Sequence, residues 1–243
     1  NLDRAYVRNG SAYFRGADVA AAAGLSRERG IELAREQGGH PDDPDKEDPL
    51  DAALWQRSVG DEPAWPSPWG PGRPGWHAEC TAMALSTFGP TVDLHVGGAD
   101  LAFPHHAYEA AQAEAYTNVR PFARAWLHVG SVLVDGEKMA KSKGNLVYVH
   151  EVLDRYPPGA LRLLILSRPW AEPWEFTEAD LDRAAAELEQ LWRHGSTAGD
   201  RDAAEHEVAV ALLDDLDVRR ALDIARTAGG QVLRDLVALL GLT

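Results

Sequence analysis

The stretch that decides the fold is WHAECTAMALSTFGPTVDLHVGGAD, residues 76–100. Residues 76–88 have the apolar spacing of a helix, and TVDLHV at 91–96 is a short apolar strand that runs into two glycines. A helix followed by such a strand is typical of a protein whose helices cover a parallel sheet.

The next segments repeat this alternation. HHAYEAAQAEAY at 105–116 predicts a helix, and WLHVGSVLV at 126–134 predicts one strand, closed by the turn residues Asp135 and Gly136. Strands that alternate with helices indicate strand–helix–strand units around a parallel sheet, and ligands of such sheets bind beyond the carboxyl ends of the strands. Here those ends are HVGGAD and VDGEKMAKSKGN.

The flanking regions predict two further parts. Residues 1–60 indicate a small α/β region, with a hairpin turning at Asn9-Gly10 and a helix ending before Gly38-Gly39. Residues 61–157 follow as the sheet-bearing region, which opens on a proline-rich loop containing two tryptophans. Residues 158–243 indicate a helical bundle, in which Thr177 and Asp180 form a capping pair and 207–225 and 231–242 are helical.

Composition limits the functional class. The formal net charge of −14 argues against a broad electrostatic grip on nucleic acid, although a local basic site remains compatible with it. No apolar run approaches the roughly 20 residues of a membrane span. A single cysteine indicates no internal disulfide and favours a reducing, cytoplasmic location. The densest lysine cluster, Lys138, Lys141 and Lys143, is where we expect phosphate chemistry.

Three side chains suggest a metal site without establishing one. On a helix His105 and Glu109 are four residues apart and share a face, and His106 and Glu109 form a second possible pair. Taken alone, such a pair is better explained by ordinary surface pairing. Cys80 adds a thiolate, which with an imidazole and a carboxylate gives at most three of the four zinc ligands, although a lone cysteine is also a common buried residue. If they share an ion, the Cys80 and His105 side chains should approach within about 4–5 Å.

Two loops suit a nucleotide. The lysines of GEKMAKSKGN, 136–145, could stabilise a departing pyrophosphate, or they could form an ordinary solvated turn. The glycines of HVGGAD would let a ligand approach the backbone, and Asp100 could hold ribose hydroxyls, although a plain tight turn explains them too.

PGWHAEC at 74–80, HVGGAD followed by FPHH, and GEKMAKSKGN, in this order and spacing, resemble the second half of cysteinyl-tRNA synthetase and its close relative mycothiol ligase. KMAKS at 138–142 is similar to the KMSKS loop of class I synthetases. The resemblance implies the second half of a class I synthetase Rossmann-like parallel-sheet domain followed by a small α-helical bundle. It also implies ATP with Mg²⁺ and L-cysteine as substrates.

The resemblance assigns roles to particular residues. It implies one zinc ion per chain, held by Cys80 and His105, with Glu109 matching the zinc-binding glutamate of the tRNA enzymes and Trp76 packing on the cysteinyl adenylate. In the family this zinc binds the sulfur of the substrate cysteine. Lys138 and Lys141 would stabilise the leaving pyrophosphate. The residues that would line the adenylate site are Gly98, Ala99, Asp100 and Val132.

The sequence also departs from the family pattern. Val96 replaces the first glycine of HGGG, Ala140 replaces the loop serine, and HHAYE stands where the tRNA enzymes have HHENE. The HIGH signature and the first zinc cysteine, which would be the fourth ligand, lie on the preceding half in the family. We therefore expect a missing N-terminal half in the same or another chain.

Three functions remain open at this point. EQGGHP at 36–41 resembles the ERGGDP stretch of mycothiol ligase, which the tRNA enzymes lack. This resemblance and the short acidic bundle favour the ligase, which joins cysteine to the small amino sugar glucosaminyl-inositol. Glu109 favours the alternative, a cysteine–tRNA ligase with tRNA as partner. A degenerate, non-catalytic synthetase-like module is the third reading, which the retention of Cys80, His105, Lys138 and Lys141 argues against.

Overall fold

The computed structural model describes residues 2–194 and 202–242. The chain divides by its internal contacts into two compact units, Asn1–His128 and Val129–Thr243. This division cuts across the region 61–157, whose assignment to a single functional domain stays a prediction. Each unit is described by itself.

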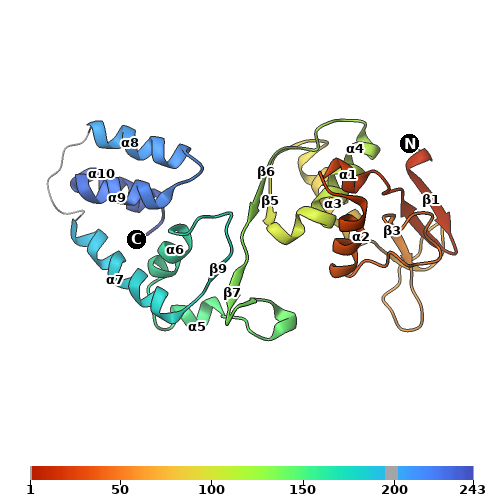
Figure 1. The fold of residues 1–243 in the computed structure, drawn as a ribbon, viewed down its shortest axis with the longest axis horizontal. Helices are drawn as coiled ribbons and strands as arrows, with labels where there is room; N and C mark the ends of the chain where they lie inside the picture. The colour runs from red at the N-terminus through yellow and green to blue at the C-terminus, as the bar shows by residue number, and fades with distance from the viewer. Residues whose placement is uncertain (1, 195–201, 243) are drawn as a thin grey trace. The chain divides into compact units, whose positions relative to one another are not determined.

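The first unit opens with a four-stranded antiparallel sheet formed by β1 (Ala5–Arg8), β2 (Ser11–Phe14), β3 (Ala52–Arg57) and β4 (Gly72–Pro74), in that spatial order (Figure 1). The expected hairpin at Asn9-Gly10 is confirmed, because both turn residues have positive φ. The end of the proline-rich loop forms β4, which sequence periodicity did not indicate. Its pairing with β3 is a contact between distant segments.

Two helices follow the hairpin, α1 (Val19–Ala22) and α2 (Arg27–Glu36). The helix expected before Gly38-Gly39 is confirmed as α2, whose N-cap Ser26 accepts a hydrogen bond from the Arg29 backbone N–H. Phe14, Leu50, Phe103 and Tyr108 are buried in one cluster, and this cluster packs the sheet against the part of the unit that carries the candidate site.

The strand–helix–strand unit is confirmed within the first unit. Helix α3 (Trp76–Phe88) leads to β5 (Val92–Gly98), and α4 (Ala107–Thr117) then leads to β6 (Ala123–Val129). β5 and β6 are parallel neighbours in one sheet, and Figure 1 draws them side by side. Short turns at Ala99–Leu101 and Ala102–His106 join β5 to α4.

The single strand expected over 126–134 is wrong. The chain forms β6 and then, after Gly130, a separate strand β7 (Val132–Val134), which pairs antiparallel with β8 (Glu137–Lys138) and parallel with β9 (Trp174–Glu175). A Cβ at Gly130 would lie 2.1 Å from the Glu172 carbonyl carbon and oxygen, so the close approach of this backbone needs glycine there.

The rest of the second unit is helical, as expected. Its helices are α5 (Val149–Leu153), α6 (Pro158–Leu166), α7 (Glu178–His194), α8 (Asp202–Leu213), α9 (Val218–Ala228) and α10 (Gly230–Leu239). The Thr177 cap of α7 is confirmed, since its hydroxyl accepts from the Asp180 N–H. The segment 207–225 is not one helix: Asp215 and Leu216 have positive φ, and Asp217 caps α9.

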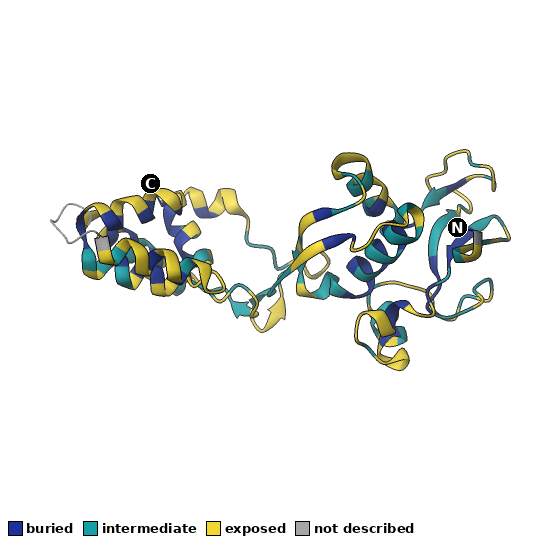
Figure 2. Cartoon of the chain, turned by 90° about the horizontal axis from the view of Figure 1, so that it is seen from above, coloured by how far each residue is buried: buried dark blue, intermediate teal, exposed yellow. Residues whose placement is uncertain are grey.

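The bundle is held by a continuous apolar core, whose residues appear dark blue in Figure 2. Leu188, Leu191, Leu222 and Leu233 are fully buried there. None of the helices in the described parts of the chain combines the length and apolar character needed to cross a membrane.

We predict that Leu222→Ala lowers the free energy of unfolding by about 2–5 kcal/mol, because it removes a buried side chain and leaves a cavity. Leu213→Ala is the matched control, since Leu213 is 87% exposed and its loss should change stability little. Urea unfolding monitored by circular dichroism measures both. Equal effects of the two substitutions would contradict the assignment of this core.

Candidate functional site

The structure brings Cys80, His105 and Glu109 together. Cys80 lies in the second turn of α3, His105 in the turn that precedes α4, and Glu109 in the first turn of α4. One potential ligand atom from each of the three lies within 4.8 Å of the others. The expected approach of Cys80 to His105 is therefore confirmed, and it results from α3 packing beside α4.

Glu109 is the centre of the cluster. Its side chain is 3% exposed, with Oε1 2.9 Å from His105 Nε2 and Oε2 3.1 Å from His95 Nε2. Oε2 lacks a hydrogen bond of good geometry, although the distance to His95 is short. Burial raises the pKa of Glu109, but the His105 hydrogen bond and the neighbouring imidazoles outweigh it and leave the pKa below its usual value. Glu109 is thus a buried carboxylate whose Oε2 contacts His95 without a hydrogen bond of good geometry.

His77 hydrogen-bonds the ring nitrogen of His105 that does not face Glu109. The two Nδ1 atoms are 2.8 Å apart, so one donates to the other, while His105 Nε2 faces Glu109. Burial, followed by the proximity of His105, lowers the pKa of His77 to about 4, so the ring is neutral at pH 7. It also stacks on Tyr108. His105 is therefore oriented by a second imidazole.

A second group of imidazoles lies on the other side of Glu109. His95, His106 and Glu109 also place one ligand atom each within 4.8 Å of one another. His106 hydrogen-bonds His128 at 2.8 Å, and burial lowers the pKa of His106 to about 4. A Cβ at Gly97 would fall 2.4 Å from the His106 ring, so glycine is needed at this position to make room for the imidazole.

Trp76 and Cys80 form the accessible part of the cluster. The Trp76 ring stacks on His105 with centroids 4.3 Å apart, yet it remains 48% exposed, which leaves one face open to a ligand. Cys80 is half-buried, and burial, followed by the charge of Glu109, raises the pKa of its thiol. A cation is therefore needed to favour the thiolate at neutral pH.

Gly98, Ala99 and Asp100 lie at the carboxyl end of β5, three to five residues beyond His95. β5 ends at Gly98, and Ala99 begins the short helical turn that contains Asp100. A Cβ at Gly98 would meet Asp100 Oδ1 at 2.5 Å, so the small residue lets this carboxylate approach the backbone. These residues belong to the same unit as the cluster, at the strand end where α/β proteins bind ligands.

Val132, Lys138 and Lys141 belong to the second unit. The Val132 carbonyl accepts from the Met139 N–H at 2.8 Å. Asn145 ties the loop together, because its side chain accepts from the Ala140 N–H at 2.9 Å and donates to the Lys138 carbonyl at 3.2 Å. Both lysines are exposed, and Lys141 begins a short helical turn, Lys141–Lys143. The loop therefore extends from the β7–β8 hairpin, is held together by Asn145, and exposes the Lys138 and Lys141 side chains.

Sequence reasoning missed the supporting residues. His77, His95 and His128 were not singled out, nor was Asn145. A signal existed for His77, which precedes Cys80 by three residues and therefore shares its face of α3. None existed for the His106–His128 contact, because it joins residues 22 positions apart in the chain.

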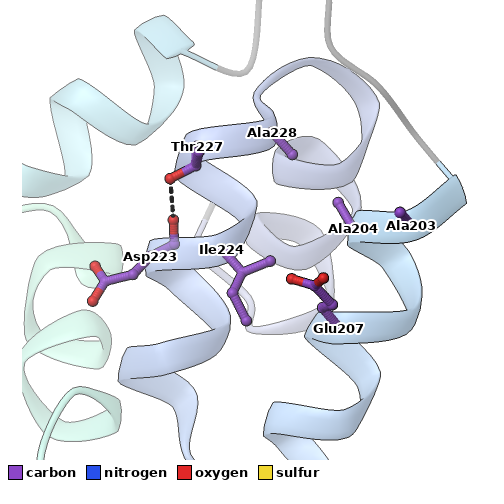
Figure 3. A pocket seen from close by; sticks show the side chains of 7 residues that line it. All are labelled: Ala203, Ala204, Glu207, Asp223, Ile224, Thr227 and Ala228. Carbon is purple, nitrogen blue, oxygen red and sulfur yellow. Dashed lines mark hydrogen bonds between the residues drawn. The ribbon is translucent and has the colours of Figure 1, made fainter.

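Of two hollows on the described surface, one is lined by residues of the bundle and the other partly by His95, which contacts Glu109. One of about 520 Å³ lies between α8 and α9 and is lined mainly by alanines, Ile224, Glu207 and Asp223 (Figure 3). Its Thr227 hydroxyl already donates to the Asp223 carbonyl. Another, of about 490 Å³, runs between α3 and β5. The candidate site is defined by its converging side chains.

Comparison with known proteins gives a consistent result. The family model described as tRNA synthetases class I (C) catalytic domain matches residues 2–186. The L-cysteine:1D-myo-inositol 2-amino-2-deoxy-alpha-D-glucopyranoside ligase of Rhodococcus jostii (strain RHA1) is 46% identical over 83% of this chain and 49% of its own length. The cysteine–tRNA ligase of Picosynechococcus sp. (strain PCC 7002) is 46% identical over 77% of this chain and 40% of its own.

A solved structure supports the fold. The LeuRS of Agrobacterium radiobacter K84, in a ternary complex with tRNA and LeuAMS, superposes with a TM-score of 0.52 at 15% identity, covering 77% of this chain and 34% of that one. The chain spans about half the length of the curated relatives named above. With the family model covering residues 2–186 and the expected parallel-sheet and bundle architecture in place, this chain belongs to the class I tRNA synthetase (C) catalytic domain family.

Proposed function

We propose that this chain is part of a ligase that activates L-cysteine with ATP as cysteinyl adenylate and transfers it to a small amino sugar, glucosaminyl-inositol. The observation that carries the proposal is the convergence of Cys80, His105 and Glu109 within 4.8 Å. A cysteine-activating enzyme must distinguish a thiol from the hydroxyl of serine, which a pocket shaped only for size does poorly. A thiophilic cation beside the substrate supplies that discrimination.

The residues of the cluster fit a zinc ion. A thiol, an imidazole and a carboxylate are the donor types that zinc prefers. Oε2 of buried Glu109 further favours a bound cation, because its contact with His95 lacks good hydrogen-bond geometry and a poorly satisfied buried carboxylate oxygen is costly. Cys80, His105 and Glu109 would hold the ion, and the preceding half of the family fold would supply the fourth ligand. When bound, zinc would lower the pKa of the substrate thiol and bind its sulfur.

The surrounding residues have separate roles. His77 holds the His105 ring so that Nε2 faces the metal position. The exposed face of Trp76 packs against the substrate, and Asp100, with Gly98 and Ala99, lies where ribose hydroxyls would bind. Val132 contacts the adenine side. In the Mg²⁺-dependent activation step, Lys138 and Lys141 stabilise the charge that develops on the leaving pyrophosphate.

The acceptor is the step that separates the two groups of relatives. A small amino sugar brings its own nucleophilic amine to the activated carbonyl, so the protein needs only to position it. A tRNA acceptor needs an extended basic surface, and residues 159–243 carry more acids than bases. This charge favours the amino sugar. The alternative, a cysteine–tRNA ligase, is favoured by Glu109, which matches the zinc glutamate of the tRNA enzymes.

The first prediction concerns the metal. The complete protein should bind one zinc or cobalt(II) ion per chain, and the cobalt form should show thiolate-to-metal charge-transfer absorption. Cys80→Ser should lower the intensity of that absorption, because the cysteine expected on the preceding half would remain as a thiolate ligand. It should also weaken binding by more than the roughly 10- to 100-fold typical of losing a residue that only orients a ligand. His150→Asn, outside the cluster, is the control. An unchanged spectrum in Cys80→Ser would contradict the assignment.

The second prediction concerns the lysine loop. Lys141→Ala in the complete protein should lower cysteine-dependent ATP–pyrophosphate exchange by about 10²-fold, with a smaller change in the KM for ATP, because the charge acts mainly in the transition state. Lys143→Ala is the comparison within the same cluster and should lower exchange less, because the resemblance assigns no role to Lys143 and its charge already pairs with Glu137 at 3.5 Å. If exchange were equally fast in Lys141→Ala and the unmodified protein, the loop would be a solvated turn.

The third prediction concerns the acceptor. The complete protein should couple cysteine to glucosaminyl-inositol and bind tRNA only weakly at physiological salt, because its helical bundle is acidic. Mass spectrometry of the coupled product and filter binding of labelled tRNA measure the two activities. Efficient charging of tRNA with cysteine, lost on removing the bundle, would establish the alternative.

A further inference from the structure

A second set of potential metal ligands lies beside the proposed zinc site. His95, His106 and Glu109 each offer one donor atom, and these atoms lie within 4.8 Å of one another. Two imidazoles and a carboxylate are a donor set that borderline divalent ions such as Zn²⁺, Co²⁺ and Ni²⁺ bind. This set contains neither Cys80 nor His105. It is therefore a separate group of donors that shares one carboxylate with the first.

The spacing of His95 and Glu109 fits a shared ion better than a hydrogen bond. His95 Nε2 lies 3.1 Å from Glu109 Oε2, yet among the described residues this buried oxygen has no hydrogen-bond partner of good geometry. Two donors that each lie about 2.0–2.2 Å from one metal ion are about 3–3.5 Å apart. The ion then lies to one side of the line that joins them, so the ring nitrogen need not point at the oxygen. His95 and Glu109 thus already have the spacing of neighbouring ligands.

His106 is held in place for the third donor. The residue is 3% exposed, and its Nδ1 lies 2.8 Å from His128 Nε2. This contact orients the ring and leaves Nε2 for another partner. The ring also meets that of His95 edge-on, with centroids 4.5 Å apart. The space for the imidazole depends on Gly97, because a Cβ there would lie 2.4 Å from the ring. The two imidazoles are therefore kept side by side next to the carboxylate.

We propose that His95, His106 and Glu109 bind a second divalent cation of the zinc class, with Glu109 bridging the two ions. Oε1, 2.9 Å from His105 Nε2, serves the first ion, and Oε2 serves the second. The second ion binds after the first, because its donor set lacks a thiolate and because two cations that share one carboxylate repel each other. At one equivalent of metal the protein holds one ion, and the second enters in excess.

Cobalt(II) distinguishes the two ions by their ligands. Cobalt bound to the Cys80 thiolate has charge-transfer absorption, whereas cobalt bound only by nitrogen and oxygen has none. The complete protein, freed of metal, is titrated with cobalt(II), and bound cobalt is measured by equilibrium dialysis. We expect two ions per chain in excess metal. The charge-transfer absorption should be complete after the first ion, and the second should add only weak visible bands.

Variants identify the ligands of the second ion. His95→Asn and His106→Asn should each weaken its binding by more than about 100-fold and leave the charge-transfer absorption of the first ion unchanged. His128→Asn removes only the residue that orients His106, so its effect should be about 10- to 100-fold. His150→Asn, at an exposed site on α5, is the matched control and should change neither ion. Melting temperatures without metal show which variants fold, and His95 and His106 report independently.

Three results would overturn the proposal: a single bound cobalt ion in excess metal, a second ion that survives both His95→Asn and His106→Asn, or loss of the charge-transfer absorption in both variants. The last result would mean that all five side chains hold one ion. Cys80→Ser separates this proposal from the zinc assignment, because it should weaken the first ion and leave the second in place. None of these readouts depends on catalysis or on the acceptor.

Discussion

The burial of Glu109 is the constraint on which the first unit depends. Removing a carboxylate from water is unfavourable unless charges or hydrogen bonds compensate, and here the compensation comes from His105 and His95. His105 lies in the turn before α4 and His95 lies on β5. The His105 ring is held by His77 and Trp76, and the His95 ring packs against His106. One side chain of α4 therefore contacts both the turn before α4 and the strand β5.

Local signals in the sequence predicted the local parts of this arrangement. Helix α3 begins and ends where the apolar spacing of 76–88 indicated, and the hairpin at Asn9-Gly10 and the Thr177 cap are set by residues within a few positions of each other. Local spacing paired His105 with Glu109 on one helix face, whereas the family resemblance added Cys80 to them. What failed was long-range: the break after β6 is imposed by the backbone of Glu172, and the pairing of β3 with β4 joins distant segments.

The two parts of the proposed chemistry are built in opposite ways. The cluster of the first unit is buried and its rings are locked by stacking and hydrogen bonds, which suits a site that must select one sulfur compound. The lysine loop of the second unit is exposed and tied only through the Asn145 side chain, which suits groups that act on a leaving anion and then release it. Substituting alanine for the usual serine at 140 leaves this tie intact, since Ala140 contributes its backbone N–H.

The chain contains one cysteine, and it lies within this cluster. Within residues 1–243 a thiol-specific alkylating reagent can therefore modify one position only, and the mass of this chain records directly whether it has reacted. The raised pKa of the free thiol makes that reaction slow, and coordination of the sulfur would block it. Occupancy of the site can thus be followed by protection from labelling in a crude mixture, without a chromophore and without knowing the acceptor.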